Sequence, residues 1–289
     1  MVLHCNTGIP NSRRKISGTE IMFNKKVVVI TGGSSGLGLS MAHILQKKGA
    51  KLILVSRDTK KLENAKKEIE SAESDRETVQ IFACDVADKT RVRDTFKAIS
   101  ESVEHPDILI NSAGVLNEGC FTDLAVDTFR FVMDINFYGT LHCIQEVLPG
   151  MRKKGAGQIL NICSVAGRMG VYGYAAYCAS KHAVMGLTKS LRCELDGTGV
   201  SLHIAFPPEF DSPMVEELNS CRTPENRKMV QTIPVMGVEK VANLIIRGLE
   251  KNLFEIIPGL PSRVVCSFNQ HFPDFAHRAA MSRIRGCKS

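Results

Sequence analysis

The chain repeats one local pattern along most of its length: a short apolar run rich in valine, isoleucine and leucine, then a longer segment whose apolar residues recur every three or four positions. The first pair is "KKVVVITGG" and "LGLSMAHILQKKGA", where the strand stops at glycines and the helix ends at Gly49. Continuously apolar strands that alternate with helices are typical of parallel sheets covered on both faces. We therefore expect one doubly wound α/β domain of the Rossmann type over residues 24–258.

The same pattern sets the remaining elements. Strands are expected at "KLILVS", "VQIFACDV", "DILINSAG", "GQILNICS", "VSLHIAFP" and near 253–257, with helices over 59–73, 88–103, 124–154, 175–195 and 238–251. A lid-like segment precedes the helix over 238–251. Residues 1–23 are expected to be a disordered extension, and residues 259–289 a C-terminal appendage.

Composition excludes several classes of protein. The net charge of +7 is not gathered into a basic block, so no nucleic-acid partner is expected. No apolar run approaches the roughly 18 to 20 residues of a membrane span, and residues 1–21 lack the hydrophobic stretch of a signal peptide. The ten cysteines never show a CxxC spacing, which favours reduced thiols and argues against a metal site. A cytoplasmic protein without a metal is expected.

A glycine-rich turn, "TGGSSGLG", lies between the first strand and the first helix. Glycine lets the backbone turn sharply and approach a pyrophosphate at a helix N-terminus, although the same residues could form a merely structural turn. The pattern predicts that a dinucleotide contacts Gly32, Ser34, Ser35, Gly36, Leu37 and Gly38.

The residues at the end of the second strand indicate which dinucleotide is bound. An acidic residue there would take a ribose 2′-hydroxyl, whereas Arg57 can bind a 2′-phosphate through charge-assisted hydrogen bonds. NADP(H) is therefore expected rather than NAD(H). Two observations leave this open: Asp58 follows directly, and Arg57 could be a solvated charge in front of a helix.

Tyr177 and Lys181 stand four residues apart at the start of an expected helix, so their side chains share one face. A neighbouring ammonium is expected to lower the pKa of the phenol and make it a general acid or base, although the pair alone could be an ordinary surface pair. Ser164 ends a strand thirteen residues before Tyr177. Asn136 lies in an apolar helix, where a buried amide needs a partner.

These motifs, with "DV" at 85–86 and "NSAG" at 111–114, occur in the order and at the spacing of the classical short-chain dehydrogenase/reductase family, which the chain resembles over about residues 24–258. The resemblance implies that Tyr177 donates a proton to a substrate carbonyl, Ser164 binds its oxygen, Lys181 binds the nicotinamide ribose and tunes Tyr177, and Asn136 holds a water. It also implies cofactor contacts at Asp85, Val86, Asn111, Ala113, Gly114, Tyr177, Lys181, Pro207 and Ser212. Ser112 and Pro208 depart from the family pattern.

The loop "AFPPEFDSP" and the stretch around Tyr177 resemble the 3-ketosphinganine reductase branch, which reduces a long-chain 2-amino-3-ketone with NADPH. Glu209 or Asp211 could then pair with the substrate amine, while Ser164, Tyr172 and Tyr174 line its pocket. Alternatively, Ser212 caps a helix that begins at Pro213 and the acids favour its dipole, while Tyr172 and Tyr174 pack the loop. The other functions considered are reduction of a steroid, a 3-oxoacyl thioester or a xenobiotic carbonyl, and non-catalytic sensing of NADP(H).

The C-terminal appendage places apolar residues at spacings of three or four among arginines: Val264, Phe268, Phe272, Phe275 and Ala279. Such a stretch could lie on a lipid surface, roof an acyl-chain pocket, or pack on its own domain. A peripheral membrane contact through 259–289 is thus one expectation. The family resemblance also implies a homo-oligomer formed by the helices around 139–154 and 175–195.

Overall fold

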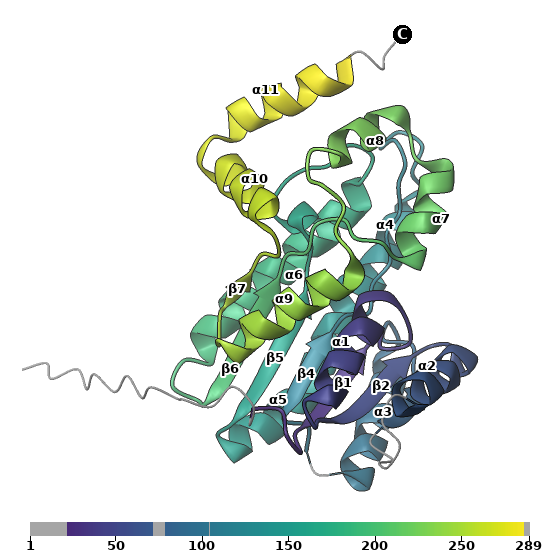
Figure 1. Ribbon diagram of the computed structural model, residues 1–289, viewed down its shortest axis with the longest axis vertical. Helices are drawn as coiled ribbons and strands as arrows, with labels where there is room; N and C mark the ends of the chain where they lie inside the picture. The colour runs from purple at the N-terminus through teal and green to yellow at the C-terminus, as the bar shows by residue number, and fades with distance from the viewer. Residues whose placement is uncertain (1–21, 72–78, 104, 286–289) are drawn as a thin grey trace, which may run out of the picture.

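A computed structural model of the protein describes residues 22–71, 79–103 and 105–285. Its centre is a parallel seven-stranded sheet in the order β3-β2-β1-β4-β5-β6-β7, which confirms the predicted α/β architecture (Figure 1). The strands are β1 (Val27–Thr31), β2 (Lys51–Ser56), β3 (Val79–Ala83), β4 (Ile108–Asn111), β5 (Gly157–Ile162), β6 (Val200–Ala205) and β7 (Glu255–Ile256).

Helices cover both faces of this sheet. The helices are α1 (Gly36–Lys47), α2 (Thr59–Ser71), α3 (Lys89–Ser102), α4 (Val126–Met133), α5 (Gly139–Lys154), α6 (Ala175–Glu194), α7 (Pro213–Cys221), α8 (Pro224–Val230), α9 (Val238–Glu250), α10 (Leu260–His271) and α11 (Pro273–Ile284). Alternate residues of β1 point to opposite faces. Val28 and Ile30 join a core with α1 and α9, while Val27 and Val29 join a second core with α3 and α5.

The predicted helices agree with this arrangement to within a few residues, with one irregularity. The helices predicted around 124–154 are α4 and α5, and a π-helical turn, Asp134–Tyr138, separates them. Such turns widen the backbone spacing and are frequent at functional sites. Asn136 lies at the centre of this turn, with its side chain buried.

The N-terminal boundary differs from the prediction. Phe23, which the sequence places in the disordered extension, is 1% exposed and packs in the core with α1 and α9. Its aromatic ring explains the difference, because its burial fixes the chain just before β1. Residues 1–21 of the predicted extension lie outside the described residues.

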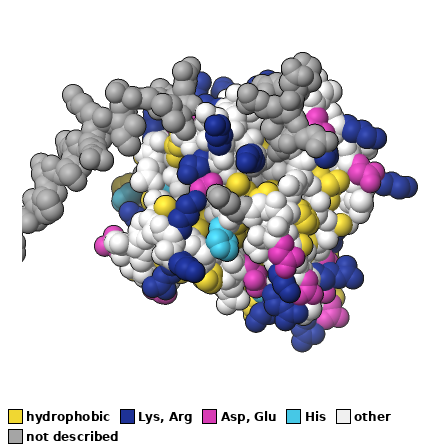
Figure 2. All heavy atoms as spheres, turned by 90° about the horizontal axis from the view of Figure 1, so that it is seen from below, with side chains coloured by type: hydrophobic (Ala, Val, Ile, Leu, Met, Phe, Trp, Pro, Cys, Tyr) yellow, Lys and Arg dark blue, Asp and Glu magenta, His cyan; other side chains and the backbone are white. Residues whose placement is uncertain are grey.

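The C-terminal appendage consists of α10 and α11, which stand at the top of Figure 1, with α11 packed on α8. Within the described residues, no helix combines the length and apolar character that crossing a membrane requires. Figure 2 shows the face that lies below in Figure 1, where Lys and Arg side chains are interspersed with Asp and Glu.

Replacing Phe23 tests where the folded domain begins. Phe23→Ala should lower the free energy of unfolding by about 3–5 kcal/mol, because it removes a fully buried ring and leaves a cavity. Phe121→Ala is the matched control: Phe121 is 73% exposed, and its loss should change stability by about 0.5 kcal/mol or less. Urea denaturation followed by circular dichroism measures both. If both variants changed the free energy of unfolding by the same small amount, the folded domain would not begin at Phe23.

Candidate active site

The loops that follow β1, β4, β5 and β6 meet at the carboxyl edge of the sheet, where they surround a cavity of about 690 Å³. Ligands of doubly wound folds bind at this edge. The cavity is lined by Gly32, Gly36, Gly114 and Lys181 together with residues of α7, α8, α10 and α11. The glycine turn and the C-terminal helices therefore share one cavity.

The glycine turn leaves room for a phosphate. A Cβ on Gly32, whose φ is 67°, would lie 2.8 Å from the amide nitrogen of Ala113, and a Cβ on Gly38 would collide with the Gly32 carbonyl. Ser35 is the N-cap of α1 and, among the described residues, makes no side-chain cap hydrogen bond. The first-turn N–H groups of α1 thus face a cradle that only glycines can form, which fits a dinucleotide pyrophosphate.

Of the residues predicted to contact the cofactor in this turn, most line the cavity and one does not. Lining residues are Gly32, Ser35, Gly36, Leu37 and Gly38. Ser34 lies outside the lining, and its cofactor contact stays a prediction: it is 9% exposed, and its hydroxyl donates to the Ser56 hydroxyl at 2.9 Å. Its role is to hold the glycine turn against the end of β2.

Arg57, Asp85 and Val86 lie on the same edge of the sheet but outside the cavity lining. β2 pairs with β3 so that Ser56 stands opposite Ala83, which brings the two strand ends side by side. Arg57 is exposed, whereas the Asp85 carboxylate accepts a hydrogen bond from the Ala87 N–H at 3.0 Å and Val86 is buried. A dinucleotide reaching from the glycine turn toward β3 would pass all three residues.

Asn111, the last residue of β4, also lies outside the cavity lining, and its cofactor contact stays a prediction. It is 3% exposed, and its amide donates to the Asn161 side-chain oxygen at 2.8 Å. Asn161 in turn donates to Thr188 of α6 at 2.9 Å. Asn111 therefore ties β4 to β5 and α6 beneath the site. Ala113 and Gly114, also predicted, do line the cavity.

Ser164, Tyr177 and Lys181 come together at the cavity wall, as predicted. Ser164 is the N-cap of a short 3-10 turn, Val165–Gly167, and its hydroxyl accepts from the Ala166 N–H at 3.1 Å. The Lys181 ammonium donates to the Ile162 carbonyl at 3.0 Å and lies 5.6 Å from the centroid of the Tyr177 ring. One turn of α6 separates the phenol from the ammonium.

The acidity of Tyr177 differs from the prediction. Burial raises the pKa of Tyr177 above its usual range, and the hydrogen bond to the Ser164 hydroxyl opposes this only in part. Burial also lowers the pKa of Lys181. The expected lowering of the phenol's pKa by the ammonium is therefore outweighed, because removing both groups from water disfavours both charged forms. Tyr177 keeps its proton and is suited to donate it.

The side chain of Asn136 is hydrogen-bonded within the protein. Its amide donates to the Val115 carbonyl and to the Ser180 hydroxyl, both at 2.9 Å, and its oxygen accepts from the Val115 N–H at 2.8 Å. It is 1% exposed and outside the cavity lining. Its side chain fixes the loop after β4 against α6, and its expected role of holding a water stays a prediction.

The two other tyrosines of the loop before α6 separate in space. Tyr174 is 5% exposed, lines the cavity, and packs edge-on against Tyr177 with ring centroids 5.9 Å apart. Tyr172, also predicted to bind substrate, lies outside the cavity lining, and its hydroxyl is 3.8 Å from the sulfur of Cys120. Tyr172 packs the loop, since its neighbour Gly173 turns the chain at a φ of 76°.

The two acids of "PPEFDSP" have different surroundings. Asp211 lies outside the cavity and accepts a hydrogen bond from the Val238 N–H at the start of α9, which contradicts its placement at the substrate. Glu209 lines the cavity and forms a bidentate ion pair with Arg222, at 3.1 and 2.8 Å. Ser212 both lines the cavity and caps α7, accepting from the Val215 N–H at 3.3 Å, with Pro213 at the first helical position.

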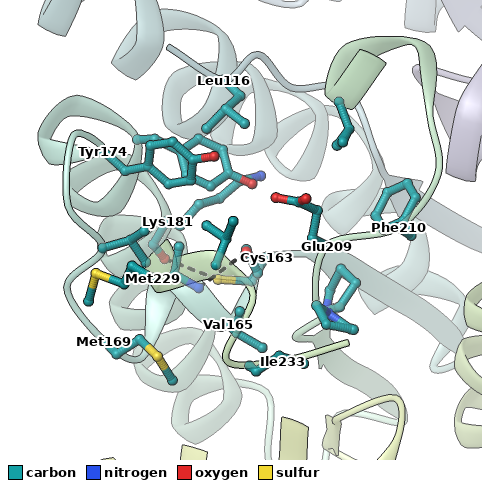
Figure 3. Close-up of a pocket in the computed structure, with 18 of the residues that line it drawn as sticks. Leu116, Cys163, Val165, Met169, Tyr174, Lys181, Glu209, Phe210, Met229 and Ile233 are labelled. Carbon is teal, nitrogen blue, oxygen red and sulfur yellow. Dashed lines mark hydrogen bonds between the residues drawn. The ribbon is translucent and has the colours of Figure 1, made fainter. Parts of the chain in front are cut away.

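Arg222 is a site residue that sequence reasoning missed. Its side chain is 2% exposed, and besides Glu209 it reaches the Tyr174 hydroxyl at 3.4 Å. Figure 3 shows the Glu209 carboxylate facing Tyr174, while Met169, Val165, Ile233 and Met229 gather in the apolar part of the cavity. The sequence shows Arg222 only as one charge in the lid-like segment, because its partners are distant in the chain.

Two further contacts hold the walls of the site. Pro207, predicted to contact the cofactor, lines the cavity, and its carbonyl accepts from the Val165 N–H at 3.1 Å. Arg168, directly after the Ser164 turn, forms an ion pair with Glu255 of β7 and stacks over the Phe206 ring with 4.3 Å to its centroid. The Ser164 turn is thereby anchored to β6 and β7.

Comparison with known proteins agrees with this geometry. Residues 26–223 match the family model described as short chain dehydrogenase. The chain is 35% identical over 241 residues to "3-dehydrosphinganine reductase" of Danio rerio, covering 83% of this chain and 73% of that protein. It is 36% identical over 229 residues to "3-ketodihydrosphingosine reductase" of Bos taurus, covering 78% and 69%.

Solved structures show the same fold. A short-chain dehydrogenase/reductase from Burkholderia phymatum in complex with NAD has a TM-score of 0.78 at 24% identity, covering 88% of this chain and 95% of that chain. A variant of actinorhodin polyketide ketoreductase with NADPH has a TM-score of 0.74 at 28% identity, covering 82% and 97%. The protein belongs to the short-chain dehydrogenase/reductase family of oxidoreductases.

Proposed function

We propose that the protein reduces the 3-keto group of 3-ketosphinganine to give sphinganine, with NADPH as the reductant. The observation that carries this proposal is the composition of the cavity. A proton donor, Tyr177, and a hydroxyl, Ser164, share the cavity with one carboxylate, Glu209, and with an apolar wall from α8, α10 and α11. A long-chain 2-amino-3-ketone has a matching carbonyl, ammonium group and alkyl chain. The two named relatives act, by their names, on this ketone.

The cofactor side of the cavity supports a nicotinamide dinucleotide. When bound, NADPH would supply the hydride that adds to the carbonyl carbon. The glycine turn and the N-terminus of α1 would hold its pyrophosphate, and Arg57, exposed at the end of β2, would pair with the 2′-phosphate. Lys181, beneath Tyr177 on α6, would bind the nicotinamide ribose.

The residues of this chain supply the proton and hold the carbonyl. Ser164 would donate a hydrogen bond to the carbonyl oxygen, and Tyr177 would transfer its phenolic proton to the same oxygen as negative charge develops there. Burial, which raises the pKa of Tyr177, keeps this proton on the phenol until transfer. The apolar side chains around the site exclude water and strengthen both hydrogen bonds.

Glu209 would receive the substrate ammonium. Among the described residues that line the cavity, it is the single carboxylate. Each Glu209 carboxylate oxygen accepts one hydrogen bond from Arg222, and a carboxylate has about four lone-pair sites, so acceptor capacity remains. The alkyl chain would then lie along Met169, Met229 and Ile233 toward the C-terminal helices.

Turnover of a ketone panel tests both the substrate and the mechanism. With NADPH, 3-ketosphinganine should be reduced faster than a steroid ketone, a 3-oxoacyl thioester or a xenobiotic carbonyl. Tyr177→Phe should lower kcat/KM by about 100-fold to 10,000-fold, because the proton donor is lost. Tyr138→Phe, a tyrosine 43% exposed on the surface, should keep the wild-type rate.

Three results would contradict this function. If the protein reduced another ketone but not 3-ketosphinganine, the substrate would be a different one. An unchanged rate in Tyr177→Phe would remove the phenol from the mechanism, and NADPH binding without turnover of any ketone would indicate a sensor.

The preference for NADPH is tested at Arg57. Arg57→Gln should raise the Kd for NADPH about 10-fold to 100-fold, because a charge-assisted contact to the 2′-phosphate is lost, and should leave NADH binding unchanged. Lys60→Gln, an exposed lysine of α2, is the control. Titration by fluorescence measures each Kd. An equal loss for both cofactors would contradict this role of Arg57.

Recognition of the amine is tested at Glu209. Glu209→Gln should raise KM for 3-ketosphinganine about tenfold or more, because the ammonium loses its counter-charge, while a ketone of equal length without the amine keeps its KM. Because the change also removes the counter-charge of the buried Arg222, thermal melting checks that the variant is folded. Glu216→Gln, exposed on α7, is the control. Equal losses on both ketones would reject ammonium pairing.

A further inference from the structure

The helical hairpin formed by α10 and α11 has two different faces. Its inner face is closed: Ser262 and Cys266 are 0% and 1% exposed, and Ile284 is 1% exposed. Its outer face carries large apolar side chains that are exposed to solvent: Leu260, Val264, Phe268, Phe272 and Phe275. The domain therefore covers the inner apolar side of the hairpin and leaves the outer apolar side exposed.

The three exposed phenylalanines form a single cluster. The Phe268 ring centroid lies 5.5 Å from that of Phe272 and 5.8 Å from that of Phe275. These side chains are 40%, 59% and 65% exposed, so the cluster faces outward. Scattered apolar residues are normal on a surface, whereas a contiguous patch of rings marks a site of interaction.

The charge around the cluster is predominantly positive. Between Leu260 and Arg285 the hairpin has four arginines, at 263, 278, 283 and 285, against one carboxylate, Asp274. Among the described residues, none of these arginines forms a salt bridge, although Arg263 donates to the Ile257 carbonyl and Arg283 to the Thr232 hydroxyl. Basic side chains next to exposed aromatic rings match a negatively charged surface with an apolar interior.

The cluster also continues into the cavity. Val264 and Phe268 are exposed on the hairpin and at the same time line the cavity that contains Tyr177. An apolar path therefore runs from the outer face of the hairpin to the proton donor. An alkyl chain that followed this path would remain in contact with apolar side chains.

We propose that the outer face of α10 and α11 docks on the surface of an anionic lipid bilayer, with the phenylalanine cluster among the acyl chains and Arg263 and Arg278 at the phosphates. The cavity then opens toward the bilayer, and a lipid substrate enters beside Val264 and Phe268. A second copy of the chain is disfavoured as the occupant, because a symmetric contact would place the arginines of one hairpin against those of the other. The docking does not depend on which ketone is reduced; the entry route rests on the proposed function.

Co-sedimentation of the full chain with vesicles tests the docking. Vesicles of phosphatidylcholine with phosphatidylserine should bind the protein more tightly than phosphatidylcholine alone, and added salt should weaken the binding. Phe272→Ser with Phe275→Ser should weaken it about tenfold or more, because two rings no longer insert. Phe121→Ser with Phe131→Ser, 73% and 51% exposed in the wild type, is the matched control and should bind like the wild type.

A second variant separates the charge contribution. Arg263→Gln with Arg278→Gln should reduce binding to the anionic vesicles and leave the weak binding to phosphatidylcholine unchanged. All variants concern exposed side chains, and thermal melting verifies that they fold. Absence of vesicle binding by the wild type, or equal binding by the phenylalanine variant, would overturn the proposal. The proposal would also be overturned if the wild type were a dimer that binds no vesicles and if this dimer dissociated in the phenylalanine variant. The patch would then serve self-association.

Turnover distinguishes failure of the docking from failure of the proposed function. Phe272 and Phe275 do not line the cavity. Their replacement should slow reduction of a long-chain ketone held in vesicles, while a short, water-soluble 2-amino-3-ketone is reduced at the wild-type rate. If the wild type reduces neither ketone, the proposed function fails, and vesicle binding still decides the docking.

Discussion

Parallel pairing of β1, β4, β5 and β6 is the constraint on which the site depends, because it brings four strand ends to one edge of the sheet. The glycine turn follows β1, the Gly114 loop follows β4, Ser164 follows β5 and Glu209 follows β6. These residues are far apart in the sequence. A change of one residue in the register of β4 on β5 would invert the side chains of β4 and withdraw Asn111 from Asn161.

Buried polar side chains hold this edge in place. Asn111 and Asn161 join two strands to α6, and Asn136 joins the loop after β4 to the same helix. A buried amide without partners would destabilise the fold by about 1–3 kcal/mol. Among the described residues these amides are paired with one another, with hydroxyl groups and with the backbone, except at the side-chain oxygen of Asn111, and this pairing favours one arrangement of the loops. The position of Tyr177 and Lys181 on α6 is fixed by residues that do not themselves line the cavity.

Features set by local spacing were predictable from the sequence, and features set by contacts between distant segments were not. The order of strands and helices, the glycine turn, and the pairing of Tyr177 with Lys181 depend on residues within one or two turns. The inward orientation of Asn111, the separation of Tyr172 from Tyr174, and the ion pair between Glu209 and Arg222 depend on packing across the fold. The predicted direction of the Tyr177 pKa shift is wrong because a sequence contains the neighbouring charge but not the burial of both groups.

The retained proton on Tyr177 has a consequence for catalysis. Reduction of a ketone starts from the neutral phenol, whereas oxidation of an alcohol starts from the phenolate. Burial that raises the pKa of Tyr177 thus favours the protonated phenol, which is the state from which reduction starts. The apolar wall around this one hydroxyl group therefore keeps the proton donor loaded before a ketone arrives.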